Sequence, residues 1–316
     1  MLTFTSKFCR DCLMESSIIC WSNCNSFAKS DFVFVGVPDE TLSHSIRRGT
    51  SSAPNKVRML SWDRDVYIEN GILSKAFSNR GEPKNKLFDL GNVKREDIPN
   101  VYSKIFGCGK IPITIGGDHS ITTPIIKTLG KTRKPISLVY FDAHPDFLSS
   151  TTNFYGSVVN DVLPYIDTKS SVMIGIRSPE QEEIENIRKC GLKVISAEDI
   201  RYFGLKQTLN EILSTVGKNV YISFDMDCID PAFAPGVSVP VPLGLDNVTA
   251  SILVKGISKN GVLGLDIMEV CPEYDIQDLT SHLASRLVCE FFAVTQIQKE
   301  KTLENSIKNF KNEKEI

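Results

Sequence analysis

Residues 219–236, NVYISFDMDCIDPAFAPG, constrain the fold of this chain more than any other stretch. The segment begins with β-branched and aromatic residues typical of a buried strand and ends in three acids, Asp225, Asp227 and Asp230. Carboxylates two residues apart on an extended chain project to the same side, so they repel each other unless a positive charge lies between them. The spacing therefore favours a bound cation. Taken alone, the stretch is equally typical of a polar turn closed by the proline and glycine residues that follow.

Predicted strands and helices alternate along the chain. Apolar runs predict strands at residues 32–38, 111–115, 136–141, 171–174, 193–195, 219–225 and 262–268, and 86–90 is a candidate short strand. Helices are expected at 53–60, 97–106, 121–129, 181–190, 197–216 (with Gly204 inside), 246–256 and 278–298. This order predicts the α/β class. We expect a three-layer fold, a parallel sheet flanked by helices on both faces, whose ligands bind beyond the carboxyl ends of the strands.

The chain divides into three parts by composition. Residues 31–298 are predicted to form a single α/β domain, because no linker or repeat of fixed period interrupts them. Residues 299–316 form a charged C-terminal tail, and residues 1–30 form an N-terminal extension that contains Cys9, Cys12, Cys20 and Cys24. Two interpretations of the extension stay open. One is a four-thiolate zinc site with unusually close cysteine pairs, and the other is a dispensable segment with the true start at Met14.

Composition argues against several classes of partner. The formal net charge of −2 and the pI near 6.1 provide no basic surface for nucleic acid or anionic lipid. The chain has no apolar run of the roughly 18 residues that span a bilayer, and Asp11 and Glu15 interrupt any signal-peptide core. We therefore expect a cytoplasmic protein without a nucleic-acid or membrane partner, whose nine cysteines stay reduced.

Side chains that can bind metal follow four of the predicted strands. They are His119 after 111–115, Asp142, His144 and Asp146 after 136–141, Asp225 and Asp227 at the end of 219–225, and Glu269 after 262–268. The carboxyl ends of parallel strands lie at one edge of a sheet, so these residues can converge. His119 alone is also typical of a hydrogen-bonded histidine at a helix start, and 142–146 alone of an acidic loop. Together they predict a metal site.

The predicted ligands are four carboxylates and two imidazoles: His119, Asp142, His144, Asp146, Asp225 and Asp227. A set without thiolates favours Mn(II) over Zn(II). Four carboxylate charges balance two divalent cations, so we expect two Mn(2+) ions per subunit. Two cations lower the pKa of a shared water from about 16 towards about 7, which generates a hydroxide nucleophile at neutral pH. Cys228 and Cys271 lie nearby in the sequence, and a role as small buried residues is favoured over metal binding.

Four segments in order resemble the ureohydrolases, the family of arginase, agmatinase, formimidoylglutamase and guanidinobutyrase. They are residues 116–120 (GGDHS), 141–146 (FDAHPD), 223–231 (SFDMDCIDP) with 234–236 (APG), and 264–269 (GLDIME). The resemblance covers residues 31–298 and leaves out the N-terminal extension. It implies an arginase-like fold. Within the family, the sequence most resembles an agmatinase.

The resemblance further implies a binuclear manganese centre. His119, Asp142, Asp146 and Asp225 would hold one ion, and Asp142, His144, Asp225 and Asp227 the other, with Asp142 and Asp225 bridging. A metal-bridging hydroxide would attack the carbon of a guanidinium group and release urea and an amine.

The resemblance also implies chemical roles for two carboxylates, those of Glu269 and Asp146. Glu269 would receive the guanidinium group through a planar, bidentate contact. Asp146 would hydrogen-bond the hydroxide and pass its proton to the leaving amine. Asp118 and Asp230 are expected to hydrogen-bond the metal ligands, although Asp230 is also typical of a residue that shapes the turn before Pro231.

The sequence departs from the family pattern at one position. Where the family usually has a histidine thought to shuttle protons, residues 153–156 (NFYG) offer Tyr155, which we expect to bind substrate. Tyrosine, with an ordinary pKa of about 10, is a poor proton shuttle at neutral pH. Neither His44 nor His282 is at the matching position, and His282 is expected to be structural.

The segment between Asp146 and Tyr155 is short and offers few groups to bind an amino acid's α-carboxylate and α-ammonium. It therefore favours agmatine, which would yield putrescine and urea in polyamine biosynthesis. Arginase, guanidinobutyrase and formimidoylglutamase activities are alternatives. So are a non-catalytic family member that keeps the metal site and a related deacetylase with one zinc. The family also implies a homo-oligomer, a trimer or a hexamer.

Overall fold

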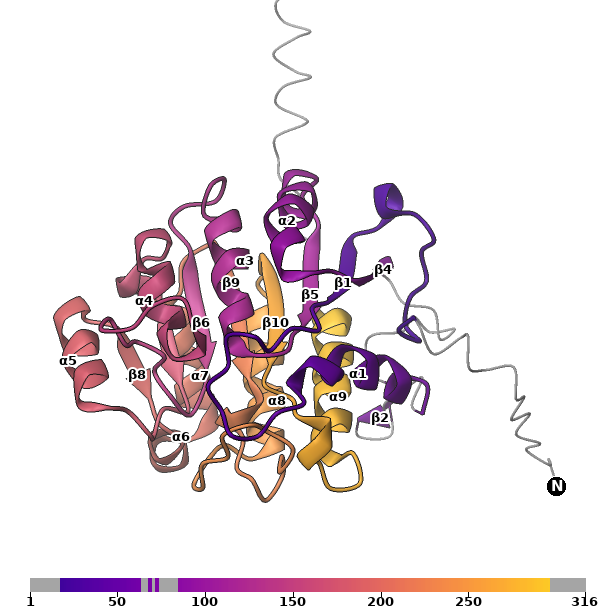
Figure 1. The fold of residues 1–316 in the computed structure, drawn as a ribbon. Helices are drawn as coiled ribbons and strands as arrows, with labels where there is room; N and C mark the ends of the chain where they lie inside the picture. Colours follow the sequence, from indigo (N-terminus) through magenta and orange to yellow (C-terminus); the bar gives the residue numbers. More distant parts are fainter. Residues whose placement is uncertain (1–17, 64–67, 70–71, 74–84, 296–316) are drawn as a thin grey trace, which may run out of the picture.

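The computed structural model describes residues 18–63, 68–69, 72–73 and 85–295 (Figure 1). Its centre is an eight-stranded sheet in the order β4-β1-β5-β10-β9-β6-β7-β8, and each neighbouring pair is parallel. In chain order the strands are β1 (Phe32–Gly36), β4 (Leu87–Asn92), β5 (Ile111–Ile115), β6 (Ser137–Phe141), β7 (Val172–Ile174), β8 (Lys193–Ile195), β9 (Val220–Asp225) and β10 (Gly264–Met268). A small antiparallel pair, β2 (Ile68–Glu69) and β3 (Ile72–Leu73), lies outside this sheet.

Helices cover both faces of the sheet (Figure 1). One layer contains α2 (Ile98–Gly107), α3 (Thr122–Leu129), α4 (Val158–Val162) and α5 (Gln181–Cys190). The other layer contains α1 (Ala53–Ser61), α6 (Ala197–Phe203), α7 (Leu205–Thr215), α8 (Asn247–Ser258) and α9 (Leu279–Val294). A separate apolar core fills the space between the sheet and each layer. The predicted three-layer fold with one parallel sheet is confirmed. None of the helices in the described ranges is long and apolar enough to cross a membrane.

The four central strands, β5, β10, β9 and β6, are buried along their whole length. Helices cover both of their faces, and this is why they are nearly continuous runs of apolar residues. In the sequence β5 and β6 come before β9 and β10, but in the sheet β10 and β9 lie between β5 and β6. Four loops that are distant in the sequence therefore leave the sheet side by side. This is the place where doubly wound α/β folds bind their ligands.

The predicted helix over 197–216 is two helices, so this prediction is wrong in its interior. Gly204 separates α6 from α7, with φ 89° and ψ 143°. A positive φ costs glycine little, because glycine has no Cβ. The Gly204 N–H still bonds to the Ile200 carbonyl oxygen at 2.9 Å and ends α6, and the chain then changes direction before α7.

Residues 18–30 pack against the edge of the sheet. Ile19 and Trp21 are buried in the core beside α1, and the N–H groups of Asn23 and Cys24 donate to the Leu87 carbonyl oxygen on β4 at 3.2 and 3.1 Å. Cys9, Cys12 and the predicted tail 299–316 lie outside the described residues. The zinc hypothesis and the division into three parts therefore stay predictions.

Arg58 on α1 is almost fully buried, and each of its three guanidinium nitrogens donates a hydrogen bond. Its Nε and Nη2 donate to the two carboxylate oxygens of Asp89 on β4 at 3.0 and 3.1 Å, and its Nη1 donates to Asn92 Oδ1 at 2.5 Å. The guanidinium also lies over the Phe34 ring, 4.9 Å from its centroid. The side chains thus tie α1 to the edge strand, and a buried charge is tolerated because it is paired and hydrogen-bonded.

Asp89→Ala is expected to lower the free energy of unfolding by about 3–5 kcal/mol, because it leaves a buried guanidinium without its carboxylate. Urea denaturation followed by circular dichroism measures this loss. Glu211→Ala is the matched control: it breaks a partly exposed pair with Lys193 (2.5 Å) and should cost no more than about 1 kcal/mol. Equal losses from the two variants would contradict the role assigned to the buried pair.

Candidate metal centre

The predicted site residues follow the four central strands. His119 follows β5 and lies in a 3-10 turn, His119–Ile121; Asp142, His144 and Asp146 follow β6; Asp225 ends β9, with Asp227 in the next 3-10 turn, Met226–Cys228; Glu269 follows β10. The sheet therefore brings together residues that are up to 150 positions apart, as the hydrogen bond between the His119 N–H and Glu269 demonstrates. The predicted convergence at one edge of the sheet agrees with this arrangement.

His119, Asp142 and Asp225 form one group of buried ligand atoms. The Nδ1 atom of His119 lies 3.0 Å from Asp142 Oδ2 and 3.0 Å from Asp225 Oδ2. Neighbouring ligands of an octahedral ion with bonds of about 2.1 Å lie about 3 Å apart, so this spacing fits donors that surround one cation.

Asp142, His144 and Asp227 form a second group, which shares Asp142 with the first. The Nδ1 atom of His144 lies 3.0 Å from Asp227 Oδ2 and 3.4 Å from Asp142 Oδ1. Backbone N–H groups hold the carboxylates in place: His144 donates to Asp142 at 2.6 Å, Ala143 to Asp227 at 3.0 Å and Asp227 to Asp225 at 2.7 Å. Two groups that share one carboxylate could hold two adjacent ions.

The charges of these groups fit divalent cations. Asp142 Oδ2 is buried and makes no hydrogen bond to any described residue, although His119 Nδ1 lies beside it. Burial, Asp227 and Asp142 together raise the pKa of Asp225 well above its ordinary value. Burial lowers the pKa of His144, but Asp227 and Asp142 raise it to about 12. The cluster therefore holds more negative charge than its own side chains can balance, and a cation would stabilise it.

Asp146 lies beside the first group. Its Oδ2 is 3.4 Å from His119 Nδ1 and accepts a hydrogen bond of 2.5 Å from the Tyr140 hydroxyl. Burial and Asp142 raise its pKa to about 6. Its backbone is left-handed, with φ 46°, a conformation that residues other than glycine rarely adopt. A carboxyl group with a raised pKa beside the other predicted metal ligands can accept and return a proton near neutral pH.

Glu269 is buried at the end of β10, also with left-handed backbone, φ 62°. One carboxylate oxygen accepts from the His119 N–H at 2.8 Å, and the Ser238 hydroxyl donates to the other. Burial raises its pKa to about 8. A buried carboxylate without an arginine or lysine partner among the described residues is suited to a cationic ligand.

Tyr155 is half-buried and senses the charges of the site. Burial, Glu269 and Asp146 raise its pKa, and His144 and Arg48 lower it. Its N–H donates to the Leu42 carbonyl oxygen at 3.3 Å, so the loop after β1 packs against it. Tyr155, which we expect to bind substrate, therefore lies close to the carboxylates of Glu269 and Asp146.

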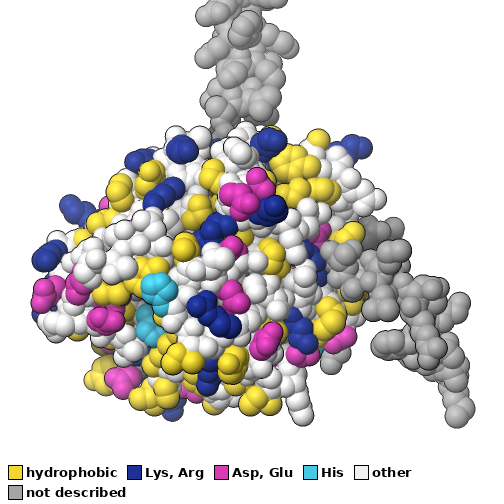
Figure 2. Space-filling model, in the orientation of Figure 1, with side chains coloured by type: hydrophobic (Ala, Val, Ile, Leu, Met, Phe, Trp, Pro, Cys, Tyr) yellow, Lys and Arg dark blue, Asp and Glu magenta, His cyan; other side chains and the backbone are white. Residues whose placement is uncertain are grey.

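His44 also lies beside Tyr155, which sequence reasoning missed. The two rings meet edge to face with centroids 6.0 Å apart, and His44 stacks on Phe154 at 5.0 Å. The path of the loop around His44 is set by tertiary contacts, so no local signal could reveal this position. Figure 2 shows histidine side chains exposed on the face of the molecule that is turned to the viewer. His282 lies on α9, with Nε2 3.8 Å from Asp63 Oδ2, and its expected structural role stays a prediction.

Two expected hydrogen-bond partners of the metal ligands have other roles, so this prediction is wrong. Asp118 accepts hydrogen bonds from Ser120 and from the Leu42 N–H, and it pairs with Arg95 at 3.2 Å. Asp230 accepts from the N–H groups of Ala232 and Gly244, as expected of a turn-shaping residue. Both carboxylates therefore hold loop backbone in place through the N–H groups that donate to them.

The two cysteines near the site are buried and belong to neither ligand group. Burial raises the pKa of Cys228 well above its ordinary value, and the Cys271 thiol donates to the Arg48 carbonyl oxygen at 3.2 Å. Both observations agree with small buried residues rather than ligands.

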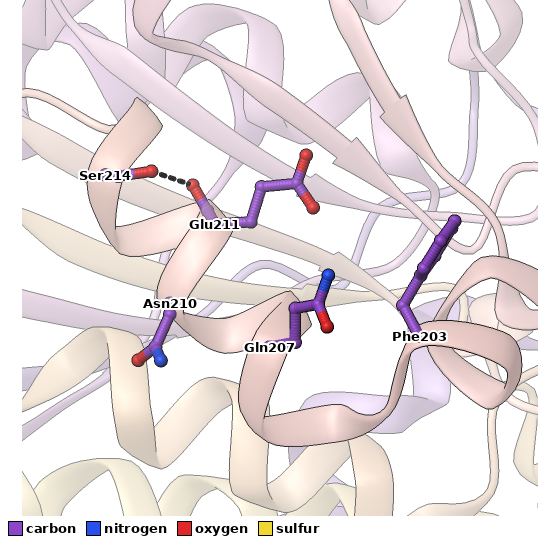
Figure 3. Close-up of a pocket in the computed structure, with 5 residues that line it drawn as sticks. All are labelled: Phe203, Gln207, Asn210, Glu211 and Ser214. Carbon is purple, nitrogen blue, oxygen red and sulfur yellow. Dashed lines mark hydrogen bonds between the residues drawn. The ribbon is translucent and has the colours of Figure 1, made fainter.

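A surface hollow of about 630 Å³ lies elsewhere, on α6 and α7 (Figure 3). It is lined by Phe203, Gln207, Asn210, Glu211 and Ser214. Its one carboxylate, that of Glu211, pairs with Lys193, and the Ser214 hydroxyl donates to the Glu211 carbonyl oxygen. The hollow brings together no group of metal-ligating or nucleophilic side chains.

Comparisons with known proteins agree with the site. The family model described as the arginase family matches residues 30–293. The agmatinase of Chromobacterium violaceum is 35% identical over 292 residues, 85% of this chain and 85% of that protein. The human mitochondrial guanidino acid hydrolase is 34% identical over 278 residues, 82% of this chain and 77% of that protein. The crystal structure of the agmatine ureohydrolase of Thermoplasma volcanium superposes with a TM-score of 0.77 at 31% identity, covering 88% of this chain and 94% of that one.

Proposed function

This chain belongs to the arginase family, and we propose that it hydrolyses the guanidinium group of a small molecule to urea and an amine at a site for two Mn(2+) ions. The observation that carries the proposal is the pair of ligand groups that share Asp142. His119, Asp142, Asp146 and Asp225 would hold one ion, and Asp142, His144, Asp225 and Asp227 the other. When bound, the ions supply Lewis acidity that makes water a hydroxide nucleophile at neutral pH.

The protein's own residues perform the remaining steps. Glu269 binds the guanidinium group, because it is a buried carboxylate that, among the described residues, accepts hydrogen bonds only from the His119 N–H and the Ser238 hydroxyl. Attack at the guanidinium carbon forms a C–O bond and breaks the C–N bond to the tail. Asp146 takes the nucleophile's proton and transfers it to the leaving nitrogen, which departs as a neutral amine. Tyr155 lies on the side of the site where the loop after β1 packs.

Urea release tests the proposal directly. Purified protein loaded with Mn(2+) is incubated with agmatine, arginine, 4-guanidinobutyrate or formimidoylglutamate, and urea or formamide is measured. We expect urea, and two ions per chain by metal analysis. One bound zinc would favour the deacetylase alternative. Two bound ions without turnover of any substrate would favour a non-catalytic family member. The predicted cytoplasmic location and homo-oligomer stay predictions.

Agmatine, which the short loop before Tyr155 favours, is the first candidate substrate. One observation favours a second candidate, a guanidino acid, whose tail ends in a carboxylate. Arg48 is exposed, its charge acts on Tyr155, and its Nη1 bonds only to the Glu40 carbonyl oxygen, at 3.0 Å, among the described residues. A cation at this position attracts a carboxylate tail and repels the ammonium of agmatine. Relatives of both kinds, an agmatinase and a guanidino acid hydrolase, are similar to this chain.

Arg48→Glu is expected to shift the ratio of kcat/KM for 4-guanidinobutyrate over agmatine towards agmatine by about tenfold or more. The two substrates differ in the charge of the tail, and butylguanidine, with a neutral tail, should be turned over by the variant at the wild-type rate. Arg48→Lys should keep the wild-type preference. An unchanged ratio in Arg48→Glu would remove the argument for a guanidino acid.

A further inference from the structure

A row of buried polar side chains crosses the four central strands close to His119. Thr114 on β5 is paired in register with Asp266 on β10, Asp266 with Ser223 on β9, and Ser223 with Tyr140 on β6. Register partners on parallel strands point to the same face, so these side chains form a line that faces α2 and α3. All are buried. Polar groups at this depth need hydrogen-bond partners, and their arrangement is therefore specific.

Asp266 is the acceptor at the centre of the row. The Ser223 hydroxyl donates to Asp266 Oδ1 at 2.7 Å. The Tyr221 and Thr122 hydroxyls each donate to Oδ2 at 3.0 Å. The carboxylate is fully buried and forms no ion pair with a lysine or arginine of the described ranges. Three hydroxyl donors take the place of a salt bridge, so the hydroxyl protons have fixed directions.

The direction in which the Ser223 hydroxyl donates its proton determines which ring nitrogen of His119 is protonated. A hydroxyl has one proton, and that of Ser223 is donated to Asp266. The Ser223 oxygen lies 2.9 Å from His119 Nε2 and can only accept there, so Nε2 carries a proton. The other ring nitrogen, Nδ1, is the atom that lies 3.0 Å from the carboxylates of Asp142 and Asp225.

Without Ser223, the neighbouring carboxylates would favour the opposite tautomer. Asp142 and Asp225 are acceptors beside Nδ1, and a proton on Nδ1 would be attracted to them. Protonated Nδ1 has no lone pair to give to a metal ion. The contact from Ser223 offsets this tendency, because it provides an acceptor for the proton on the opposite side of the ring.

We propose that Asp266, acting through Ser223, holds His119 in the tautomer with the proton on Nε2 and thereby keeps Nδ1 free to bind one metal ion. Both are positioning residues of the metal centre. The inference rests on the proposed function only in requiring a metal at this site. It concerns one ion of the two, because His144 is part-exposed and no described side chain hydrogen-bonds to its Nε2.

The test is a metal titration of the full chain after removal of metal, with Mn(2+) alone and no substrate. Ser223→Ala is expected to weaken one of two binding steps by about 10- to 100-fold and to leave the other unchanged. Asp266→Asn keeps the shape of the side chain but loses its charge, and should weaken the same step to a smaller extent. At saturating Mn(2+) the activity of both variants should return towards that of the wild type.

Tyr102→Phe is the matched control. It removes a buried hydroxyl of the same core, which lies 2.6 Å from Thr114 Oγ1. The Tyr102 hydroxyl contacts neither Ser223 nor His119. The substitution should lower thermal stability without changing either binding step. The proposal is overturned if Ser223→Ala loses stability as Tyr102→Phe does but binds both ions normally, or if it loses both ions together. If Ser223→Ala does not fold, Asp266→Asn decides by the same criteria. A wild type that binds two ions but releases no urea would refute the proposed function and leave this inference standing.

Discussion

Replacing Asp142 with alanine is expected to abolish high-affinity metal binding and to lower urea release by about 10,000-fold, equivalent to about 5.5 kcal/mol of transition-state stabilisation. Asp142 belongs to both ligand groups, with one oxygen beside His119 and the other beside His144. Its loss removes a ligand from both positions at once, as the loss of Asp225 would in the proposed ligand sets, whereas the loss of His119, His144 or Asp227 affects one position. Metal content after dialysis and a colorimetric urea assay measure the two effects.

Asp167→Ala is the control for Asp142→Ala. Asp167 makes the same kind of contact, accepting from the Lys169 N–H at 3.2 Å and the Ser170 hydroxyl at 2.8 Å, but it lies before β7 at the opposite edge of the sheet. It should cost about 1 kcal/mol of stability and no metal. An Asp142→Ala protein that keeps two tightly bound ions would exclude the shared-ligand arrangement.

Glu269→Gln is expected to lower kcat/KM for any guanidine substrate by about 100-fold or more while both metal ions stay bound. The substitution keeps the size of the side chain but removes the charge that a guanidinium group would meet. Steady-state kinetics and metal analysis on the same sample separate the two quantities. The separation matters because Glu269 also accepts a hydrogen bond from the His119 N–H.

Glu290→Gln provides the matched comparison. Glu290 is equally buried but lies on α9, away from the candidate site. Its carboxylate accepts a hydrogen bond of 2.7 Å from Arg286 Nε. Its variant should lose stability and keep kcat/KM. If Glu269→Gln instead lost metal in proportion to activity, its role would be to support the ligands, and substrate binding would have to be assigned to another residue.

The sequence predicted the strands and the residues that follow them, because both signals are local. Buried strands are apolar runs, and the acids and histidines after them interrupt that pattern at once, as in residues 136–146. Topology then follows from the alternation of strands and helices, since a parallel sheet brings all these ends to one edge. The break at Gly204 was missed because one glycine inside a helical pattern is often tolerated.

Contacts between distant segments could not be predicted. The Arg58–Asp89 pair joins a helix to a strand in a region whose polar composition gave no clear periodicity. His44 reaches Tyr155 through a loop, and loop paths depend on packing rather than on local preference. Ser223 and Asp266 had a faint signal, a polar residue inside each of two apolar strands. Their partnership requires the register of β9 and β10, which the sequence does not specify.

Asp146 and Glu269 have left-handed backbone, with φ 46° and 62°. This conformation costs a residue with a Cβ about 1–2 kcal/mol, and glycine would adopt it without that cost. Directed evolution for heat resistance alone would therefore tend to replace both carboxylates with glycine and yield tougher but inert proteins. Libraries built to improve this scaffold should keep these two codons fixed and select on turnover as well as on melting temperature.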